Sequence, residues 1–217
     1  DLLAELDETG LAGNTIVVFT SDHGEMMGAH DIRPCLKQWF YDEAAHVPFL
    51  LRHPRVPPRT ATTPINAPDV LPTLLGLASL PVPKSIEGED LSPIVTAAAP
   101  DRERAALLMG VSPFIPGLDE YRGIRTSRYT YVRGLQGPWV LFDNQADPCQ
   151  MKNLVSDPAH AEERQHLDQQ LQAELKKIGD DVRPRQYYID RWGYKVAPHG
   201  SVSYQAGAPF QSPGKQP

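Results

Sequence analysis

Three absences narrow what this sequence can be: it has no long hydrophobic run, no cluster of basic residues and only two cysteines. The longest apolar stretches, at residues 16–19 and 47–51, are far shorter than the roughly 20 residues of a membrane-spanning helix, so we expect no membrane span. The formal net charge is -6 and the Lys and Arg residues are scattered, which argues against a nucleic-acid partner. Cys35 and Cys149 form no close-spaced metal pattern, and they neither require nor exclude a disulfide.

The beginning of the chain also lacks the marks of a natural N-terminus. There is no initiator Met and no signal-peptide pattern, and residues 1–6 read as the middle of an amphipathic helix. We therefore expect that a preceding segment is missing. The sequence leaves the compartment open, whether cytoplasmic, periplasmic or secreted.

A helix, a tight turn and a buried strand open the chain, and this order predicts an α/β fold. Leu2, Leu3 and Leu6 recur at helical spacing, and Gly10 is placed to end the helix. Residues 15–20 form a continuous β-branched and aromatic run, as expected of a strand that is buried on both faces of a parallel sheet.

A second strand is predicted at residues 47–52, and a helix at residues 69–78. Between the two strands lies a long polar segment. We expect the helix to pack on the sheet through one face, which is made of Leu71, Leu74, Leu75 and Ala78.

The pattern changes after a Pro- and Gly-rich connection, so we divide the chain into a unit at 1–106 and a smaller α+β unit at 107–217. Three short β-type runs at 122–127, 129–133 and 139–143 predict an antiparallel sheet. A helix that packs on this sheet is then expected to end at Gly179, with one apolar stripe of Leu167, Leu171, Leu175 and Ile178. From Arg183 onward we expect an extended tail.

The sharpest chemical feature is Ser-Asp-His-Gly-Glu at residues 21–25, directly after the first predicted strand. Ligands collect at the carboxyl ends of strands in open α/β sheets. Asp22 and His23 would offer a carboxylate oxygen and an imidazole nitrogen to a divalent cation, and Gly24 lets the backbone turn away. The alternative is that Asp22 and His23 only cap the following helix or loop.

With its surroundings, this motif resembles the sulfatase family of the alkaline-phosphatase-like superfamily. The shared features are Asp-His-Gly-Glu after a strand, Gly-x-His at 28–30, Lys37 shortly before the aromatic and acidic residues 39–43, and the Val-Pro strand at 47–52. Weaker similarities follow at residues 69–75, 86–93, 122–126, 129–132, 141–143, 147–148 and 153–154. The resemblance covers the chain from its start to about Gly179.

The resemblance implies an α/β fold: the C-terminal part of an alkaline-phosphatase-like sheet domain, followed by a small antiparallel sheet with a packing helix. In this family the Asp and the following His ligate a divalent cation, usually Ca²⁺, so Asp22 and His23 are the candidate metal ligands. Lys37 would contact the sulfate ester as a catalytic residue, or it is a solvated loop lysine. His30 would assist the leaving group, or it holds the loop together.

The nucleophile that the resemblance implies is absent from the sequence. Sulfatases of this type carry a Cys or Ser in C/S-x-P-x-R that is oxidised to formylglycine, and neither Cys35 nor Cys149 matches this motif. We expect it upstream, so that this chain alone is inactive and the complete enzyme hydrolyses a small-molecule or carbohydrate sulfate ester. The alternatives are a phosphonate or phosphate ester hydrolase on the same scaffold, or a truncated, non-catalytic interaction module. The oligomeric state stays open.

Overall fold

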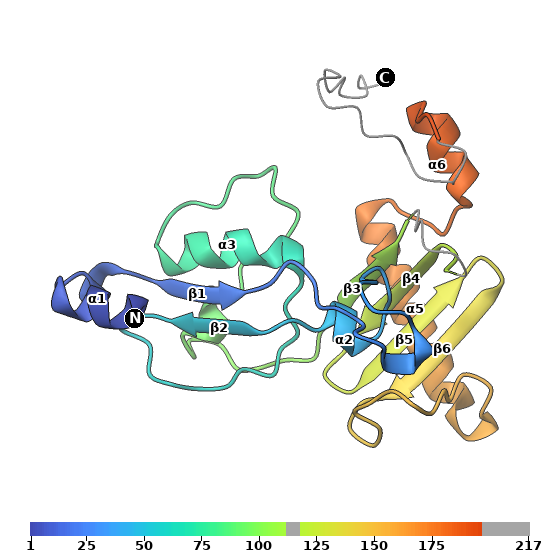
Figure 1. Cartoon of the computed structure of the whole chain (residues 1–217), viewed down its shortest axis with the longest axis horizontal. Coiled ribbons are helices and arrows are strands. Elements are labelled where there is room, and N and C mark those ends of the chain that lie inside the picture. Colours follow the sequence, from blue (N-terminus) through green and yellow to red (C-terminus); the bar gives the residue numbers. More distant parts are fainter. Residues whose placement is uncertain (112–117, 197–217) are drawn as a thin grey trace.

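The computed structural model describes residues 1–111 and 118–196, which form two regions that lie side by side (Figure 1). The helices are α1 (Leu2–Glu8), α2 (Asp42–Ala45), α3 (Ala67–Leu77), α4 (Ser92–Val95), α5 (Ala161–Ile178) and α6 (Arg185–Trp192). The strands are β1 (Val17–Thr20), β2 (Phe49–Arg52), β3 (Ala106–Gly110), β4 (Tyr121–Arg125), β5 (Tyr129–Gly134) and β6 (Gly137–Asp143). The mixed α/β class is the one that the sequence predicts.

The first region contains β1 and β2 as a two-stranded pair, with α3 alongside (Figure 1). The pair is antiparallel, with Val17 opposite Arg52 and Thr20 opposite Phe49. The prediction of a strand buried on both faces of a parallel sheet is therefore wrong for β1 in this chain, where Phe19 is 62% exposed. A run of β-branched residues determines that the backbone is extended, whereas the direction and cover of its neighbours are set elsewhere in the sequence.

Helix α3 begins two residues earlier than predicted, at Ala67, because Asn66 and Asp69 form a reciprocal capping box. Its expected packing face is partly wrong, since Leu71 and Ala78 are exposed. The buried side of the helix carries Asp69, Pro72, Thr73 and Leu77. Asp69 faces inward because its carboxylate accepts two hydrogen bonds from the Arg104 guanidinium, at 2.6 and 2.9 Å.

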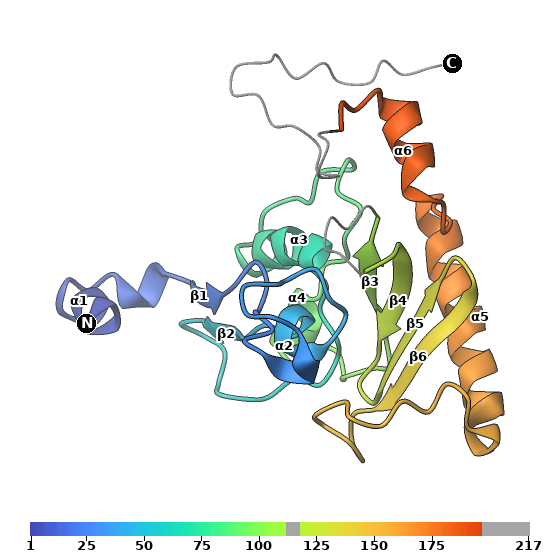
Figure 2. The ribbon, with the colours of Figure 1, turned by 45° about the vertical axis from the view of Figure 1, so that its right-hand side comes forward.

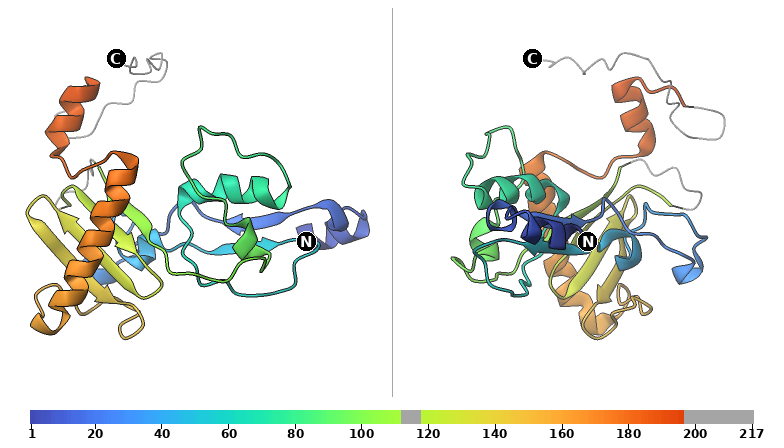
Figure 3. Two further views of the ribbon diagram at one scale, coloured as in Figure 1. Left: turned by 180° about the vertical axis from the view of Figure 1, so that it is seen from behind. Right: turned by 60° about the vertical axis from the view of Figure 1, so that its left-hand side comes forward.

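The second region is a four-stranded antiparallel sheet in the order β3-β4-β5-β6, which confirms the predicted antiparallel arrangement. Helix α5 crosses one face of this sheet (Figure 3). The predicted stripe Leu167, Leu171 and Leu175 is buried there, and Gly179 ends the helix in the left-handed conformation with φ 66°, as expected. Ile178, also assigned to the stripe, is exposed instead because it lies in the last turn.

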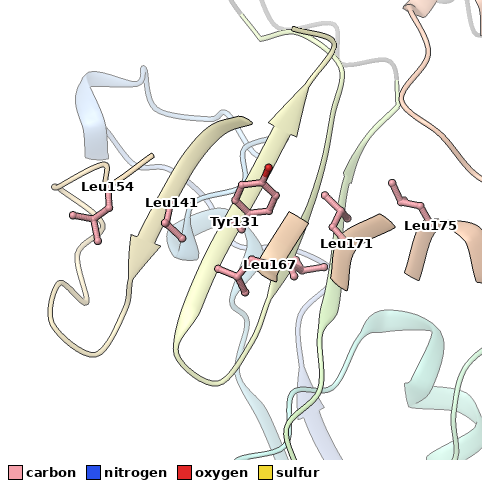
Figure 4. Close-up of a cluster of buried hydrophobic side chains, with 7 residues drawn as sticks. Tyr131, Leu141, Leu154, Leu167, Leu171 and Leu175 are labelled. Atoms are coloured by element: carbon pink, nitrogen blue, oxygen red, sulfur yellow. The ribbon is translucent and has the colours of Figure 1, made fainter. Parts of the chain in front are cut away.

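Figure 4 shows the core between α5 and the sheet, where the leucines of the helix meet side chains that project from the strands. The sheet contributes Ile124, Tyr131 and Leu141, all of which are completely buried. Successive strand residues point to opposite faces, so Val132, next to Tyr131, belongs to a second core on the other face.

That second core includes Phe40, which comes from the first region and is buried against Val132, Val140 and Phe142. Figure 2 shows α2 and its flanking loop on the side of the sheet that α5 leaves open. The two regions thus share a core, and the division at residue 107 stays a prediction.

The C-terminal part differs from the prediction of an extended tail from Arg183. Residues Arg185–Trp192 form α6, which ends at Gly193. The buried Arg122 explains this position, because its guanidinium donates hydrogen bonds to Asp180 and to the hydroxyl of Tyr188 on α6. The rest of the predicted tail, residues 197–217, lies outside the described residues. In the described part of the chain, no helix is both long and apolar enough to cross a membrane.

Candidate active site

The loop after β1 brings the two predicted metal ligands together. Asp22 is 84% exposed at its side chain, and one of its carboxylate oxygens lies 3.4 Å from Nε2 of His23. The other oxygen accepts a hydrogen bond from the backbone N–H of His23, at 3.1 Å. The two side chains therefore converge just beyond the carboxyl end of β1.

The orientation of His23 follows from a contact within the loop. Its Nδ1 lies 2.7 Å from the carbonyl oxygen of Gly24, so in the neutral ring Nδ1 carries the proton and donates it to this acceptor. Nε2 then presents a lone pair towards the Asp22 carboxylate. Histidines that bind metals usually donate their second ring N–H to a carbonyl or carboxylate in this way. A ring nitrogen and a carboxylate oxygen 3.4 Å apart can share one cation that lies between or beside them.

The segment that carries Lys37 is hydrogen-bonded to the Asp-His loop, and the charge of Lys37 acts on Asp22. Partial desolvation acts to raise the pKa of the Asp22 carboxyl, but attraction from His23, backbone hydrogen bonds and the positive charge of Lys37 together hold it below its usual value. Lys37 itself is exposed. The carbonyl oxygen of its neighbour Leu36 accepts the backbone N–H of Met26 at 3.1 Å, which ties the lysine's segment to the Asp-His loop.

Gly24 allows that segment to approach closely. Its N–H donates to the carbonyl of Ala44 at 2.8 Å, and the N–H of Glu25 donates to the carbonyl of Glu43, also at 2.8 Å. A Cβ atom at position 24 would lie 1.9 Å from the Glu43 carbonyl oxygen, a separation that no side chain can occupy. Glycine is therefore required here for close backbone approach.

His30, the second predicted catalytic residue, is held in a different environment. Its side chain is only 9% exposed and its ring stacks on Tyr41, with 3.8 Å between centroids. Its Nε2 makes no hydrogen bond, and the nearest carboxylate oxygen is that of Glu43, at 3.5 Å. These contacts are those of a residue that packs the loop, while a role in protonating the leaving group stays a prediction.

Glu43 was not singled out by sequence reasoning, although it belongs to the acidic pair behind Lys37. Its carbonyl contacts the Asp-His loop and its carboxylate faces His30, so one residue touches both. In the sequence, the acidic pair lies between Lys37 and the strand at residues 47–52. This position alone does not predict that Glu43 contacts both the Asp-His loop and His30.

Asp22 and His23 alone would make only part of a coordination shell. Within residues 1–111 and 118–196, no group of three or more His, Cys, Asp or Glu side chains lies close enough to hold a metal ion. Ca²⁺ takes six to eight oxygen ligands, so further ligands would have to come from other groups.

Residues 31–177 match the protein family described as N-sulphoglucosamine sulphohydrolase, C-terminal. An ulvan-active sulfatase of Formosa agariphila is 46% identical over 198 residues, which cover 89% of this chain and 39% of the relative. An endo-4-O-sulfatase of Bacteroides thetaiotaomicron is 31% identical over 216 residues and covers 89% of this chain, with 41% of the relative covered. The chain thus spans about two fifths of the length of these relatives.

Two solved structures resemble the fold closely. One, described as a complex with its substrate D-glucosamine-2-N,6-O-disulfate, matches with a TM-score of 0.70 and 27% identity over 85% of this chain and 38% of that chain. The other is a phosphonate monoester hydrolase of Agrobacterium radiobacter, with a TM-score of 0.66 and 27% identity over 94% of this chain and 42% of that chain.

Proposed function

The chain belongs to the sulfatase family, and on this premise we propose that it supplies part of the active site of an enzyme that hydrolyses a sulfate monoester. The observation that carries the proposal is the convergence of Asp22 and His23 at the end of β1, on a loop that is hydrogen-bonded to the segment of Lys37. The carboxylate and the imidazole can bind a cation, and an ammonium group on the adjoining segment can bind a sulfate group.

Asp22 and His23 would hold a divalent cation, which by the family resemblance is Ca²⁺. The orientation of His23 supports this fit. Its Nδ1 donates to the carbonyl oxygen of Gly24, so the lone pair on Nε2 is free and faces the Asp22 carboxylate. When bound, a divalent cation stabilises negative charge on the oxygens of the transferring group. Lys37 would bind the same group, since an ammonium offsets the charge that develops on its oxygens.

The nucleophile is expected to be a formylglycine outside this sequence, which contains no C/S-x-P-x-R motif. We therefore expect the isolated chain to bind cations weakly and to show no turnover. His30 is kept as the candidate proton donor to the leaving alcohol. Its Nε2 is buried and the ring stacks on Tyr41, so this role would require the loop to open towards the substrate.

A sulfated carbohydrate is the proposed substrate class. The relatives with the highest identity reported above are named for activity on ulvan and for an endo-4-O-sulfatase activity, and the solved complex contains a glucosamine disulfate. An exposed Asp22 and Lys37 are compatible with a substrate that approaches from solvent.

A phosphonate or phosphate ester hydrolase is the second candidate, favoured by the likeness to the phosphonate monoester hydrolase over 94% of the chain. The experiment is to express the complete coding sequence that contains this chain and to measure kcat/KM on paired sulfate, phosphonate and phosphate esters. We expect the sulfate ester to be preferred and Asp22→Ala to abolish turnover. A preference for the phosphonate would establish the second candidate, and full activity of Asp22→Ala would refute the assigned site.

A further inference from the structure

The segment of residues 36–44, which carries Lys37, lies between the Asp-His loop and the second sheet. On its first side, it accepts backbone hydrogen bonds from Gly24, Glu25 and Met26, at 2.8, 2.8 and 3.1 Å. These three donors directly follow Asp22 and His23 in sequence. These hydrogen bonds therefore couple the position of the segment that carries Lys37 to that of the loop that carries the proposed metal ligands.

On its other side, the same segment is anchored to the second sheet by an aromatic cluster. Phe40 is buried and meets Tyr121 and Trp139 edge to face, with ring centroids 5.3 and 5.2 Å apart. The hydroxyl of Tyr121 donates to the carbonyl oxygen of Gln38 at 2.8 Å. The sheet therefore contacts both neighbours of Trp39: aromatic rings pack on Phe40, and the Tyr121 hydroxyl binds the backbone of Gln38.

Asp42 adds a polar anchor next to this cluster. Its carboxylate receives two hydrogen bonds from Arg125 of β4, from Nε at 3.1 Å and from Nη2 at 3.0 Å. Its backbone N–H donates to Oε1 of Gln150, at 2.8 Å. The guanidinium fixes the direction of the carboxylate because its two donors engage both oxygens.

Gln150 is itself fixed within the second region. Its side-chain amide donates to Asn144 at 2.8 Å and to Thr130 at 3.0 Å. Gln150 and Thr130 are buried, so each of these hydrogen bonds is costly to lose without replacement. The backbone of Asp42 is therefore attached to a rigid polar network rather than to a mobile side chain.

From these contacts we infer that Asp42, Arg125 and Gln150 are positioning residues of the active site. They hold the segment of residues 36–44 on the second sheet and thereby position the segment of Lys37 against the loop of Asp22 and His23. None of the three needs to touch substrate. The inference about the geometry stands on the contacts alone, whereas its catalytic consequence rests on the proposed sulfatase function.

A matched control exists on the opposite face of the same sheet. Arg133 and Tyr131 donate to Asp168 of α5, at 2.9 and 2.8 Å. Asp168 is 29% exposed at its side chain and Asp42 is 20% exposed, and each carboxylate is paired with one arginine of the sheet. Asp42 belongs to the segment of Lys37 and anchors it, whereas Asp168 anchors α5.

The test is hydrogen exchange at the backbone amides of residues 24–26 in the 217-residue chain, compared among wild type, Asp42→Asn and Asp168→Asn. We expect about tenfold faster exchange at these amides in Asp42→Asn, because local opening of the segment exposes them. In Asp168→Asn the same amides should keep their protection even if global stability falls equally. Equal loss in both variants, or unchanged protection in Asp42→Asn, would overturn the inference.

A second variant covers the case in which Asp42→Asn fails to fold. Gln150→Met keeps the length of the side chain but cannot accept the N–H of Asp42, and it should accelerate exchange at the same three amides. If this variant leaves them protected, the inference fails.

Measurements of kcat on the protein expressed from the complete coding sequence then separate this inference from the proposed function. We expect kcat on the best sulfate ester to fall about tenfold in Asp42→Asn and to stay unchanged in Asp168→Asn, at matched melting temperatures. If neither wild type nor any variant hydrolyses a sulfate ester, the proposed sulfatase function is refuted. The hydrogen-exchange result then still decides whether Asp42 positions the segment of Lys37. Unchanged kcat in Asp42→Asn would refute the catalytic consequence alone.

Discussion

The two regions of this protein divide stability and chemistry between them. Around β1 and β2, large apolar side chains such as Phe19 and Leu50 are more than half exposed, whereas Ile124, Tyr131 and Leu141 in the second sheet are completely buried. The candidate catalytic and metal-binding residues all lie in the first region, within residues 22–37. A site in the thinly packed region needs support from elsewhere, and the contacts of Phe40 and Asp42 with the second sheet provide it.

The largest expected effect is a loss of stability, and it tests whether the second region contributes more to folding than the first. Leu171→Ala should lower the free energy of unfolding by about 2–5 kcal/mol, because Leu171 is completely buried between α5 and the sheet. The matched control is Phe19→Ala, which removes a larger but mostly exposed side chain and should change stability by less than about 1 kcal/mol in this chain. Urea denaturation of both variants decides the comparison. Equal losses would mean that the two regions do not differ in the way described.

Lys37→Ala tests the chemical side of the comparison in the complete enzyme. By analogy with the loss of one oxyanion-hole donor, which costs about 2.7–4 kcal/mol, kcat should fall about a hundredfold to a thousandfold, with little change in melting temperature. Lys37→Arg should restore only part of the rate, because a planar guanidinium places its charge differently. The exposed Lys84 serves as a control, since Lys84→Ala should leave kcat unchanged. Near-normal kcat in Lys37→Ala with a lowered melting temperature would make Lys37 structural.

Gly24→Ala examines the contact between the Asp-His loop and the segment of Lys37. The new Cβ would overlap the Glu43 carbonyl oxygen, so we expect a loss of about 1–3 kcal/mol of stability, as for other overpacked sites, and faster exchange of neighbouring amides. Gly13→Ala is the control, because a Cβ at position 13 meets nothing within 4 Å. Thermal denaturation of both variants measures the difference. A harmless Gly24→Ala would show that the loop and the segment are not closely apposed.

The smallest expected effect is a decrease in the free energy of unfolding at low pH. Burial acts to raise the pKa of Asp42, but hydrogen bonds and charge from His46 and Arg125 hold it at about 2, below the ordinary value of 3.8. A carboxyl whose folded pKa is depressed adds stability that is complete above its unfolded pKa and is lost as the pH falls. We expect a loss on the order of 2 kcal/mol between pH 4 and about pH 2.

Asp42→Asn should remove that part of the acid dependence, as measured by urea denaturation at several pH values. His46 provides an independent check, since the hydrogen bond with Asp42 raises its pKa above 6.5 despite partial desolvation. Its contribution has the opposite sign, present below pH 6.5 and lost as the pH rises through the folded pKa. In Asp42→Asn, NMR titration should show the His46 pKa returning towards 6.5. An unshifted value would contradict the assigned contact.

The parts of the fold that the sequence predicts are those encoded locally. The apolar stripe at Leu167, Leu171 and Leu175 repeats at helical spacing, and Gly179 ends the helix as expected. The pairing of β1 with β2 and the exposure of Phe19 depend on which chain segments lie alongside, which periodicity does not encode. Helix α6 was missed because its position depends on Arg122, a partner far away in sequence.

The candidate site shows the same division between local and distant information. Asp22 and His23 are adjacent in sequence, so their convergence follows from the end of a strand and is predictable. The support of the site is not predictable, because Asp42 and Gln150 are 108 residues apart and the sequence gives no sign that they are in contact. Only the structure reveals that a buried glutamine in the second region holds the backbone beside Lys37.

The most direct measurement of the central claim is a crystal structure of the complete coding product grown with Ca²⁺. The account predicts a cation within about 2.3–2.6 Å of an Asp22 carboxylate oxygen, with His23 Nε2 beside it and the Lys37 ammonium facing the same pocket. A cation bound elsewhere, with Asp22 and His23 left in solvent, would contradict it.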